Sequence, residues 1–207
     1  MKKLGKKLIV AFVVGILCYN ACYIEPLDAY TSKKTKSDLG VPSLVEDFVS
    51  NKIEHIAAIN IIEFLSKTSS NLVAYSQEHG KKLGISSKYN FIVQGQGKVM
   101  AIETENIVLK VNNATNQTIK IAADFIFGNA IRDGSGIASV GDYQNTMDFN
   151  NISVLLNNYV REHVVPPFQS KVALGDLIEF KGAIQIDTEN PNEQELRVIP
   201  LLLKIKS

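Results

Sequence analysis

Residues 89–113, YNFIVQGQGKVMAIETENIVLKVNN, decide the fold that we predict for this chain. From the start of this stretch apolar and polar residues tend to alternate, which is typical of a β-strand with one buried face. Gly95 and Gly97 interrupt the first long strand, and glycines inside a strand mark a bulge or a sharp bend. After a turn near Glu105, the second strand is IVLKV. The stretch therefore predicts a bent first strand that serves both halves of a small barrel.

Three more strands follow, with a helix between the first and the second of them. The strands are residues 117–127, 174–186 and 196–205, and the last two are joined by a turn. Residues 150–163 place apolar side chains on one face of a helix, which we expect the prolines at 166–167 to end. This order is that of the OB fold. We predict an α+β protein: N-terminal helices followed by a five-stranded OB-like β-barrel with a helix between strands three and four. Another small β-barrel or an α+β sheet is the alternative.

Apolar residues at spacings of three and four precede the strands and predict two helices. The first runs from about residue 44 to 66, after a cap at Ser43, and the second spans residues 70–82. His55 and His79 lie on these helices without a second ligand-type residue at a spacing that suits a metal. We interpret both as packed or surface histidines.

The first residues have the features of an export signal. Lysines precede residues 8–17, LIVAFVVGIL, an uncharged run of ten. Such a run is too short to span a membrane but suits a signal peptide. Ala21 is a small residue directly before Cys22, as in the cleavage site of a lipoprotein signal. We therefore predict lipidation of Cys22; an uncleaved anchor or secretion without lipid are the alternatives. Stable anchoring needs two or more acyl chains, which an acylated N-terminal cysteine provides.

The chain divides into four parts. We predict a lipoprotein signal peptide at 1–22, a polar tether at 23–43, a helical segment at 44–84 and the OB-like barrel domain at 85–207. The expected location is the bacterial cell envelope, where the protein is anchored to a membrane on its periplasmic or extracytoplasmic side.

The composition argues against nucleic acid as a partner and against a disulfide or a thiolate metal site in the folded body. A hydrophobic fraction of 45% supplies an ordinary core, and a net charge of +1 gives no long-range attraction to nucleic acid. The phenylalanines of the predicted strands are not accompanied by basic clusters, so we expect no nucleic-acid partner. Both cysteines, Cys18 and Cys22, fall in the first tenth of the chain, so the folded body has neither a disulfide nor a thiolate metal site.

Residues 127–154, FGNAIRDGSGIASVGDYQNTMDFNNISV, hold the densest polar and glycine content of the C-terminal half. A long connection inside a compact domain is usually functional or disordered, and its aromatic and aliphatic residues argue for order. A guanidinium offers five donors, which suit an anion or a sugar hydroxyl; an internal ion pair is the alternative. The candidate binding residues are Arg132, Asp133, Gln144, Asn145 and Phe149.

The sequence contains no recognisable catalytic or cofactor motif. The Gly-x-Gly at 95–97 lacks the third glycine of a dinucleotide loop, and the one at 134–136 lacks the spacing of a nucleophile elbow. The acids Asp133, Asp142 and Asp148 are spaced unlike any Ca²⁺ loop. We therefore predict no enzyme activity, no cofactor and no metal.

Residues 130–152 together with LLNNYV, GDLIEFKGAIQI and VIPLLLKI resemble a family of uncharacterised bacterial proteins described as predicted periplasmic lipoproteins. The shared elements are Ile131-Arg132-Asp133, Tyr143-Gln144-Asn145 with Phe149, Asn157, and the strand from Gly175 through Ala183. The resemblance covers about residues 90 to 205. It implies a lipid-anchored protein of the envelope, often encoded near sugar ABC transporters.

Two functional hypotheses follow from the residues and the resemblance. The first is a non-enzymatic accessory protein that contacts a small solute or a component of a sugar ABC uptake system through residues 132–149. The second is a purely structural envelope lipoprotein without a small-molecule ligand, in which the polar groups of this segment satisfy one another.

Overall fold

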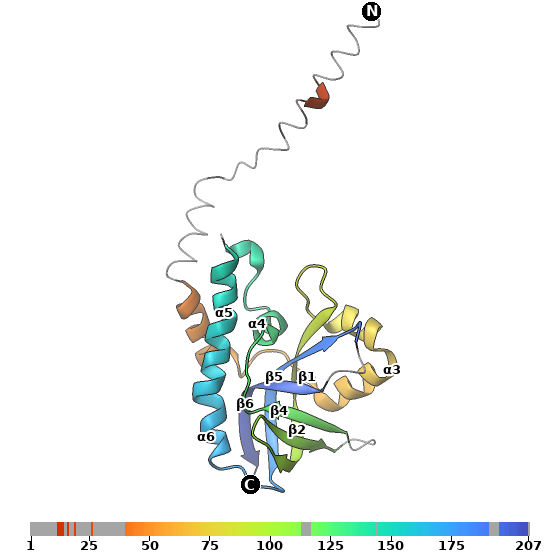
Figure 1. Cartoon of the computed structure of the whole chain (residues 1–207), viewed down its shortest axis with the longest axis vertical. Helices are drawn as coiled ribbons and strands as arrows, with labels where there is room; N and C mark the ends of the chain where they lie inside the picture. Colours follow the sequence, from red (N-terminus) through yellow and green to blue (C-terminus); the bar gives the residue numbers. More distant parts are fainter. Residues whose placement is uncertain are drawn as a thin grey trace, which may run out of the picture.

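A computed structural model shows a barrel with helices on two sides (Figure 1). The structure describes residues 12–14, 16, 19, 26, 40–112, 117–143, 145–190 and 195–206. The predicted lipidation residue Cys22 and the candidate binding residue Gln144 lie outside the described residues. The prediction for the signal peptide falls mostly on such residues.

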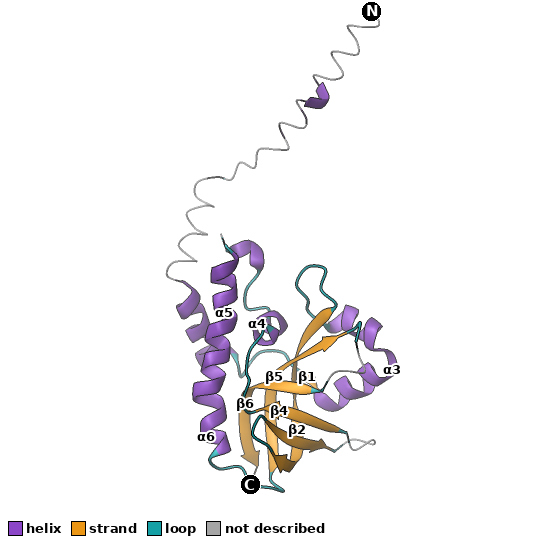
Figure 2. Ribbon diagram, viewed as in Figure 1, coloured by secondary structure: helices purple, strands orange, loops and turns teal. Residues whose placement is uncertain are grey.

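The elements follow one another as Figure 2 shows. Residues 40–47 are helical and continue into a π-helical turn, η1. The elements are η1 (Phe48–Lys52), β1 (Ile59–Asn60), α3 (Ile61–His79), β2 (Lys88–Ile102), β3 (Asn106–Val111), β4 (Thr118–Ala122), α4 (Ala130–Ser135), η2 (Val140–Asp142), α5 (Thr146–Tyr159), η3 (Val160–Val164), α6 (Val165–Gln169), β5 (Leu177–Asp187) and β6 (Arg197–Lys206).

The strands β2 to β6 close into a barrel. Their order is β2-β3-β4-β6-β5, and β2 also pairs with β5. All these pairs are antiparallel except β4 with β6, which are parallel. This arrangement confirms the predicted five-stranded OB-like barrel in an α+β protein. The short β1 is an addition, because it pairs with β2 in parallel outside the barrel order.

Strand β2 changes partners near the glycines that interrupt it. The first half of the strand pairs with β1 and β5, as at Val93, which faces Ile59 and Gly182. The second half pairs with β3 and β5. Gly95 lies between these halves, and a Cβ built on it would come within 2.3 Å of Ile61 Cγ2. Glycine is therefore required here by the close approach of α3.

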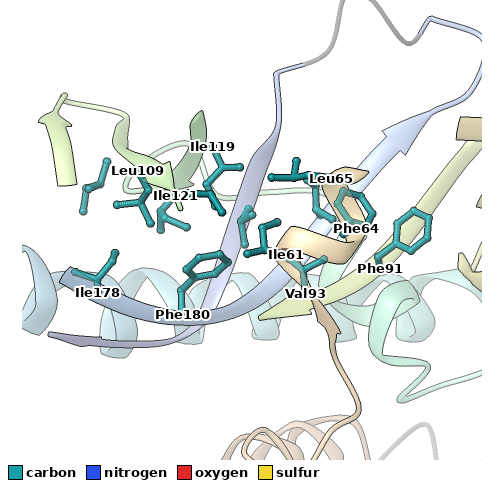
Figure 3. Close-up of a cluster of buried hydrophobic side chains, with 14 of the residues drawn as sticks. Ile61, Phe64, Leu65, Phe91, Val93, Leu109, Ile119, Ile121, Ile178 and Phe180 are labelled. Carbon is teal, nitrogen blue, oxygen red and sulfur yellow. The ribbon is translucent and has the colours of Figure 1, made fainter. Parts of the chain in front are cut away.

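Helix α3 covers one end of the barrel core. Its Ile61, Phe64 and Leu65 are almost fully buried among side chains from the strands (Figure 3). The strands contribute the aliphatic and aromatic residues Phe91, Val93, Leu109, Ile119, Ile121, Ile178 and Phe180. Burial of each such side chain contributes about 1.5–3 kcal/mol, so this shared cluster fixes α3 on the barrel.

A second apolar cluster lies outside the barrel, under the other helices. Val41, Val45 and Phe48 from the N-terminal helical segment pack with residues of α4, α5 and η3. They meet barrel residues such as Ala183 and Leu201. The N-terminal segment is thus part of the folded body from residue 40, a little earlier than the expected end of the tether at 43.

The single helix expected at residues 44–66 is wrong. The helical segment ends at Lys52, residues 53–58 turn, and β1 precedes α3. Asn60 then caps α3 by accepting from the Ile62 N–H at 2.9 Å. The expected second helix is the second half of α3, which starts at a kink where Asn71 has non-helical backbone angles. Asn71 Oδ1 accepts from Ala74 N at 3.1 Å and so caps that half.

The helix between strands three and four is longer than predicted. It begins at Thr146, passes through the π-helical turn η3 and continues as α6 to Gln169. The prolines at 166–167 occupy the first turn of α6 rather than ending the helix. Proline fits a first helical turn because its missing N–H has no helical partner there.

Candidate functional site

Arg132 on α4 is the centre of a buried polar cluster at the start of α5. Its side chain is 0% exposed and its Nε donates to Asp133 Oδ1 at 2.7 Å. Nη1 donates to the Phe149 carbonyl at 3.2 Å and to Asn150 Oδ1 at 3.1 Å. Asp133, whose side chain is 11% exposed, supplies the opposite charge. The arrangement is an internal ion pair, with α4 joined to α5 through the guanidinium.

The ring of Phe149 stacks against this guanidinium. Arg132 Cζ lies 3.8 Å from the ring centroid, a short cation–π distance. The Tyr143 ring packs against Phe149 at a tilt of 47°, with the two ring centroids 5.9 Å apart. Among the described residues, Arg132 Nη2 is buried and has no hydrogen-bond partner. The charge is therefore stabilised by one carboxylate, two oxygen acceptors and an aromatic face.

Asn145 lies at the N-terminal end of α5 and acts as its cap. Its Oδ1 accepts from Asp148 N at 2.9 Å, and its Nδ2 donates to Asp148 Oδ2 at 2.9 Å. Burial raises the pKa of the nearby Tyr143 hydroxyl above its ordinary value, and Asp142 and Asp148 add to the effect. The structure brings Arg132, Asp133 and Phe149 together, while Asn145 serves the helix end.

A guanidinium without exposed surface cannot touch a solute from this position. Arg132, Asp133 and Phe149 thus form an internal support within the segment 127–154. A cleft elsewhere on the barrel has the properties of a binding site instead.

This cleft, which we call the solute cleft, has a volume of about 590 Å³. Ligand pockets of small molecules usually have 300–1,000 Å³. Three neighbouring strands form its floor, and the chain before and at the start of α3 forms a wall. Its lining comprises Glu54, Asn60, Ile61, Ile62, Gln94, Gly95, Gln96, Asn112, Glu179, Phe180, Lys181, Leu202 and Lys204.

Strand register aligns the polar side chains of the solute cleft in two rows across β2, β5 and β6. One row is Gln94, Lys181 and Leu202, and the next is Gln96, Glu179 and Lys204. Within a strand, residues two apart share a face, so both rows lie on one side of the sheet. The result is a surface of amides, a carboxylate and lysines with apolar patches between them.

Lys181 lines the solute cleft and binds the N-terminal segment. Its Nζ donates to the carbonyls of Glu54 at 2.7 Å, Ile56 at 3.2 Å and Ile53 at 3.4 Å. These carbonyls follow η1, where a lysine is favourable because the carbonyl groups of a helix end lack partners. Burial lowers the pKa of Lys181, and the charge of Glu54 opposes that effect.

Sequence reasoning missed the solute cleft. A signal was present, because Gln94 and Gln96 alternate with buried or small residues in a strand, as do Glu179 and Lys181. Which of these pairs face one another depends on strand register between segments some 85 residues apart, and no local pattern gives that register.

Two of the three histidines, His79 and His163, lie beside aromatic rings. His79 lies 4.6 Å from the Tyr75 ring and 3.7 Å from Glu78, and His163 stacks on Tyr159 at 5.1 Å. The described part of the chain contains no group of three or more His, Cys, Asp or Glu residues that could hold a metal ion. Nor does any helix in that part have the length and apolar character to cross a membrane.

The structure is similar to the crystal structure of an OB-fold protein from Thermotoga maritima MSB8. The two share 26% sequence identity with a TM-score of 0.70, over 80% of this chain and 96% of that one. No curated protein is significantly similar to this chain.

The family model described as "Predicted periplasmic lipoprotein (DUF2291)" matches residues 12–204, nearly the whole chain. A lipoprotein is held to a membrane by its lipid, which agrees with the envelope location and the membrane anchor predicted from residues 1–22. The chain belongs to this family of predicted periplasmic lipoproteins.

Proposed function

We propose that this lipoprotein is a non-enzymatic accessory binding protein that holds a small polar solute in the solute cleft, in association with a sugar ABC uptake system. The observation that carries the proposal is the pair of polar rows, Gln94–Lys181–Leu202 and Gln96–Glu179–Lys204, on the floor of a 590 Å³ cleft. Primary amides both donate and accept hydrogen bonds, as a sugar hydroxyl does.

The apolar members of the lining support a sugar-sized ligand as well. Ile62 is exposed and Leu202 is half-buried, so each offers aliphatic surface beside the amides. Binding sites for small molecules commonly combine apolar walls with a few placed polar groups. The link to a sugar transporter rests on the resemblance to the family and on this chemistry.

The charged groups of the solute cleft suit binding rather than turnover. Lys181 Nζ is engaged by three carbonyls, and Glu54 and Glu179 each lie 3.7 Å from a lysine, Lys204 and Lys206 respectively. The lining includes no serine, cysteine or histidine that would act as a nucleophile or a general base. A protein that only binds its solute is the function that fits this lining.

In this proposal the Arg132 cluster is a support and not a contact surface. The guanidinium joins α4 to α5 within the segment 127–154. Asp133, Asn145 and Phe149 then do not touch the solute, and they affect binding only by fixing the position of this segment. The same burial supports the second hypothesis, a purely structural envelope lipoprotein, because Nε and Nη1 of Arg132 bond to groups of the same segment.

Thermal unfolding of the full chain in detergent, with a panel of pentoses, hexoses and nucleosides, tests the proposal. A ligand at 100 times its Kd stabilises the folded state by about 2.7 kcal/mol, which corresponds to a Tm increase of roughly 5–10 °C at this size. Gln96→Ala should remove the increase for the ligand that produces it, whereas Gln77→Ala, an exposed glutamine on α3, should leave it. No increase with any member of the panel would favour the purely structural role.

A further inference from the structure

Strand β6 has a strand neighbour on one side only for most of its length. Strand β5 pairs with it from Leu177 to Ile184, whereas β4 reaches it only at Arg197 and Val198. Beyond Ile199 the second edge of β6 faces no other strand among the residues that the structure describes. An unpaired edge presents main-chain N–H and C=O groups that pair readily with another chain.

A groove of about 610 Å³, which we call the edge groove, lies along this part of β6. The helical run η3–α6 forms the opposite wall, and Figure 1 shows it beside β6 near the C-terminal end. The lining comprises Leu201, Leu202, Leu203, Lys204 and Ile205 of β6 and Tyr159, His163, Val164, Pro167, Phe168 and Lys171 opposite.

The edge groove follows the main chain of β6 rather than one of its faces. Its lining takes in five consecutive residues, 201–205, and successive side chains of a strand point to opposite faces. A groove that meets all five must run along the strand edge. Five residues of strand span about 16 Å, so the groove has room for a short extended segment.

The basic side chains of the edge groove favour an occupant with acidic groups. Among the described residues, the lining holds Lys171, Lys204 and His163 and contains neither Asp nor Glu. Glu54, which lies 3.7 Å from Lys204, lines the solute cleft instead. Half-buried apolar side chains such as Leu203 lie between the basic groups.

We propose that the edge groove binds an extended segment of another envelope protein, with alternating acidic and apolar residues, as a strand added to β6. Addition of a strand to a sheet edge gives affinity through main-chain hydrogen bonds and specificity through alternate side chains. Carboxylates of the segment face Lys171 and Lys204, and its apolar residues face Leu203 and Phe168. This surface is separate from the solute cleft except for Leu202 and Lys204, which line both.

A segment of another protein with acidic and apolar residues is the occupant that this lining fits, because its carboxylates would meet Lys171, Lys204 and His163 and its apolar side chains would meet the leucines of β6.

Fluorescence anisotropy of the full chain in detergent tests the proposal with a labelled seven-residue peptide of alternating Glu and Val. We expect saturable binding, and at least tenfold weaker binding of the same peptide N-methylated at alternate residues, which removes the donors of a strand edge. A Lys-Val peptide of the same length should not bind. Lys171→Glu should weaken binding at least tenfold, and Lys67→Glu, the same charge change at an exposed residue of α3, should not.

Amide hydrogen exchange locates the bound peptide. Protection that increases at residues 201–205 on addition of the peptide is the expected result. Equal loss of affinity in Lys171→Glu and Lys67→Glu, unchanged exchange at 201–205, or full affinity of the N-methylated peptide would each overturn the proposal. So would self-association of the chain through this edge that the peptide does not compete with.

Discussion

The guanidinium of Arg132 lies over the ring of Phe149, with Cζ 3.8 Å from the ring centroid, and its Nη1 donates to the main-chain carbonyl of the same residue at 3.2 Å. One side chain thus holds both the ring and the main chain of the first turns of α5. Because Arg132 itself belongs to α4, this contact sets the position of one helix against the other.

Replacement of Arg132 should destabilise the fold rather than affect binding directly. Arg132→Met keeps a similar volume but leaves the Asp133 carboxylate buried without its cation. Removal of one partner of a buried pair costs about 3–5 kcal/mol. Chemical denaturation should show a decrease of this size in the free energy of unfolding, while Lys67→Met at an exposed position changes it by less than about 0.5 kcal/mol. A decrease below about 1 kcal/mol for Arg132→Met would contradict the supporting role.

Substitution of Gly95 tests how closely α3 approaches the middle of β2. A Cβ at this position would lie 2.3 Å from Ile61 Cγ2, so Gly95→Ala must displace α3. Such overpacking costs about 1–3 kcal/mol, which thermal unfolding detects. Gly141→Ala is the control, because no atom lies within 4 Å of the added Cβ there. Equal stability of the two variants would show that α3 does not press on the strand.

Because of Tyr143, the free energy of unfolding should depend on pH in the alkaline range. Its folded-state pKa is raised by burial and by Asp142 and Asp148, so the unfolded state releases the proton first. The stabilisation is complete below the ordinary value of 10.0 and is lost as pH rises through the folded pKa. Urea denaturation from pH 8 to 11 should therefore show that the wild type loses stability relative to Tyr143→Phe above pH 10. A constant difference between the two across this range would contradict the raised pKa.

Substitution of Cys22 tests whether this residue carries the lipid anchor that family membership implies. Cys22→Ser removes the thiol that would carry the lipid, so we expect the protein to lose incorporation of labelled fatty acid and to leave the membrane fraction. Cys18→Ser, four residues earlier, should keep both properties. If the two variants behave in the reverse way, Cys18 is the lipidated residue.

Much of the fold was readable from the sequence because its signals are local. The change of period at Tyr89, the glycines of β2 and the helix after β4 gave the barrel and its order. The break after Lys52 was not readable, because apolar spacing continues through it. Lys181, 128 residues along the chain from Ile53, binds the carbonyls there and stabilises a chain end that the local pattern does not mark.

The candidate site was predictable only in part, for a related reason. The sequence singled out Arg132, Asp133 and Phe149, which the structure places in one cluster, but a list of residue types does not tell a buried guanidinium from an exposed one. The solute cleft depends on register, which pairs Gln94 with Lys181 and Lys181 with Leu202. The first of these pairs joins strands that are distant in the chain, so only the folded barrel reveals it.

Binding of a small polar solute in the solute cleft should change the NMR signals of the side-chain amides of Gln94 and Gln96, which line the cleft. During titration of the full chain in detergent with members of the sugar and nucleoside panel, one member should shift both amide signals in a saturable way and leave that of Gln77 unchanged. Saturable shifts confined to the amides of Asn145 and Asn150, beside Arg132, would contradict the claim and place the solute at the start of α5. An absence of shifts for every member would contradict solute binding itself.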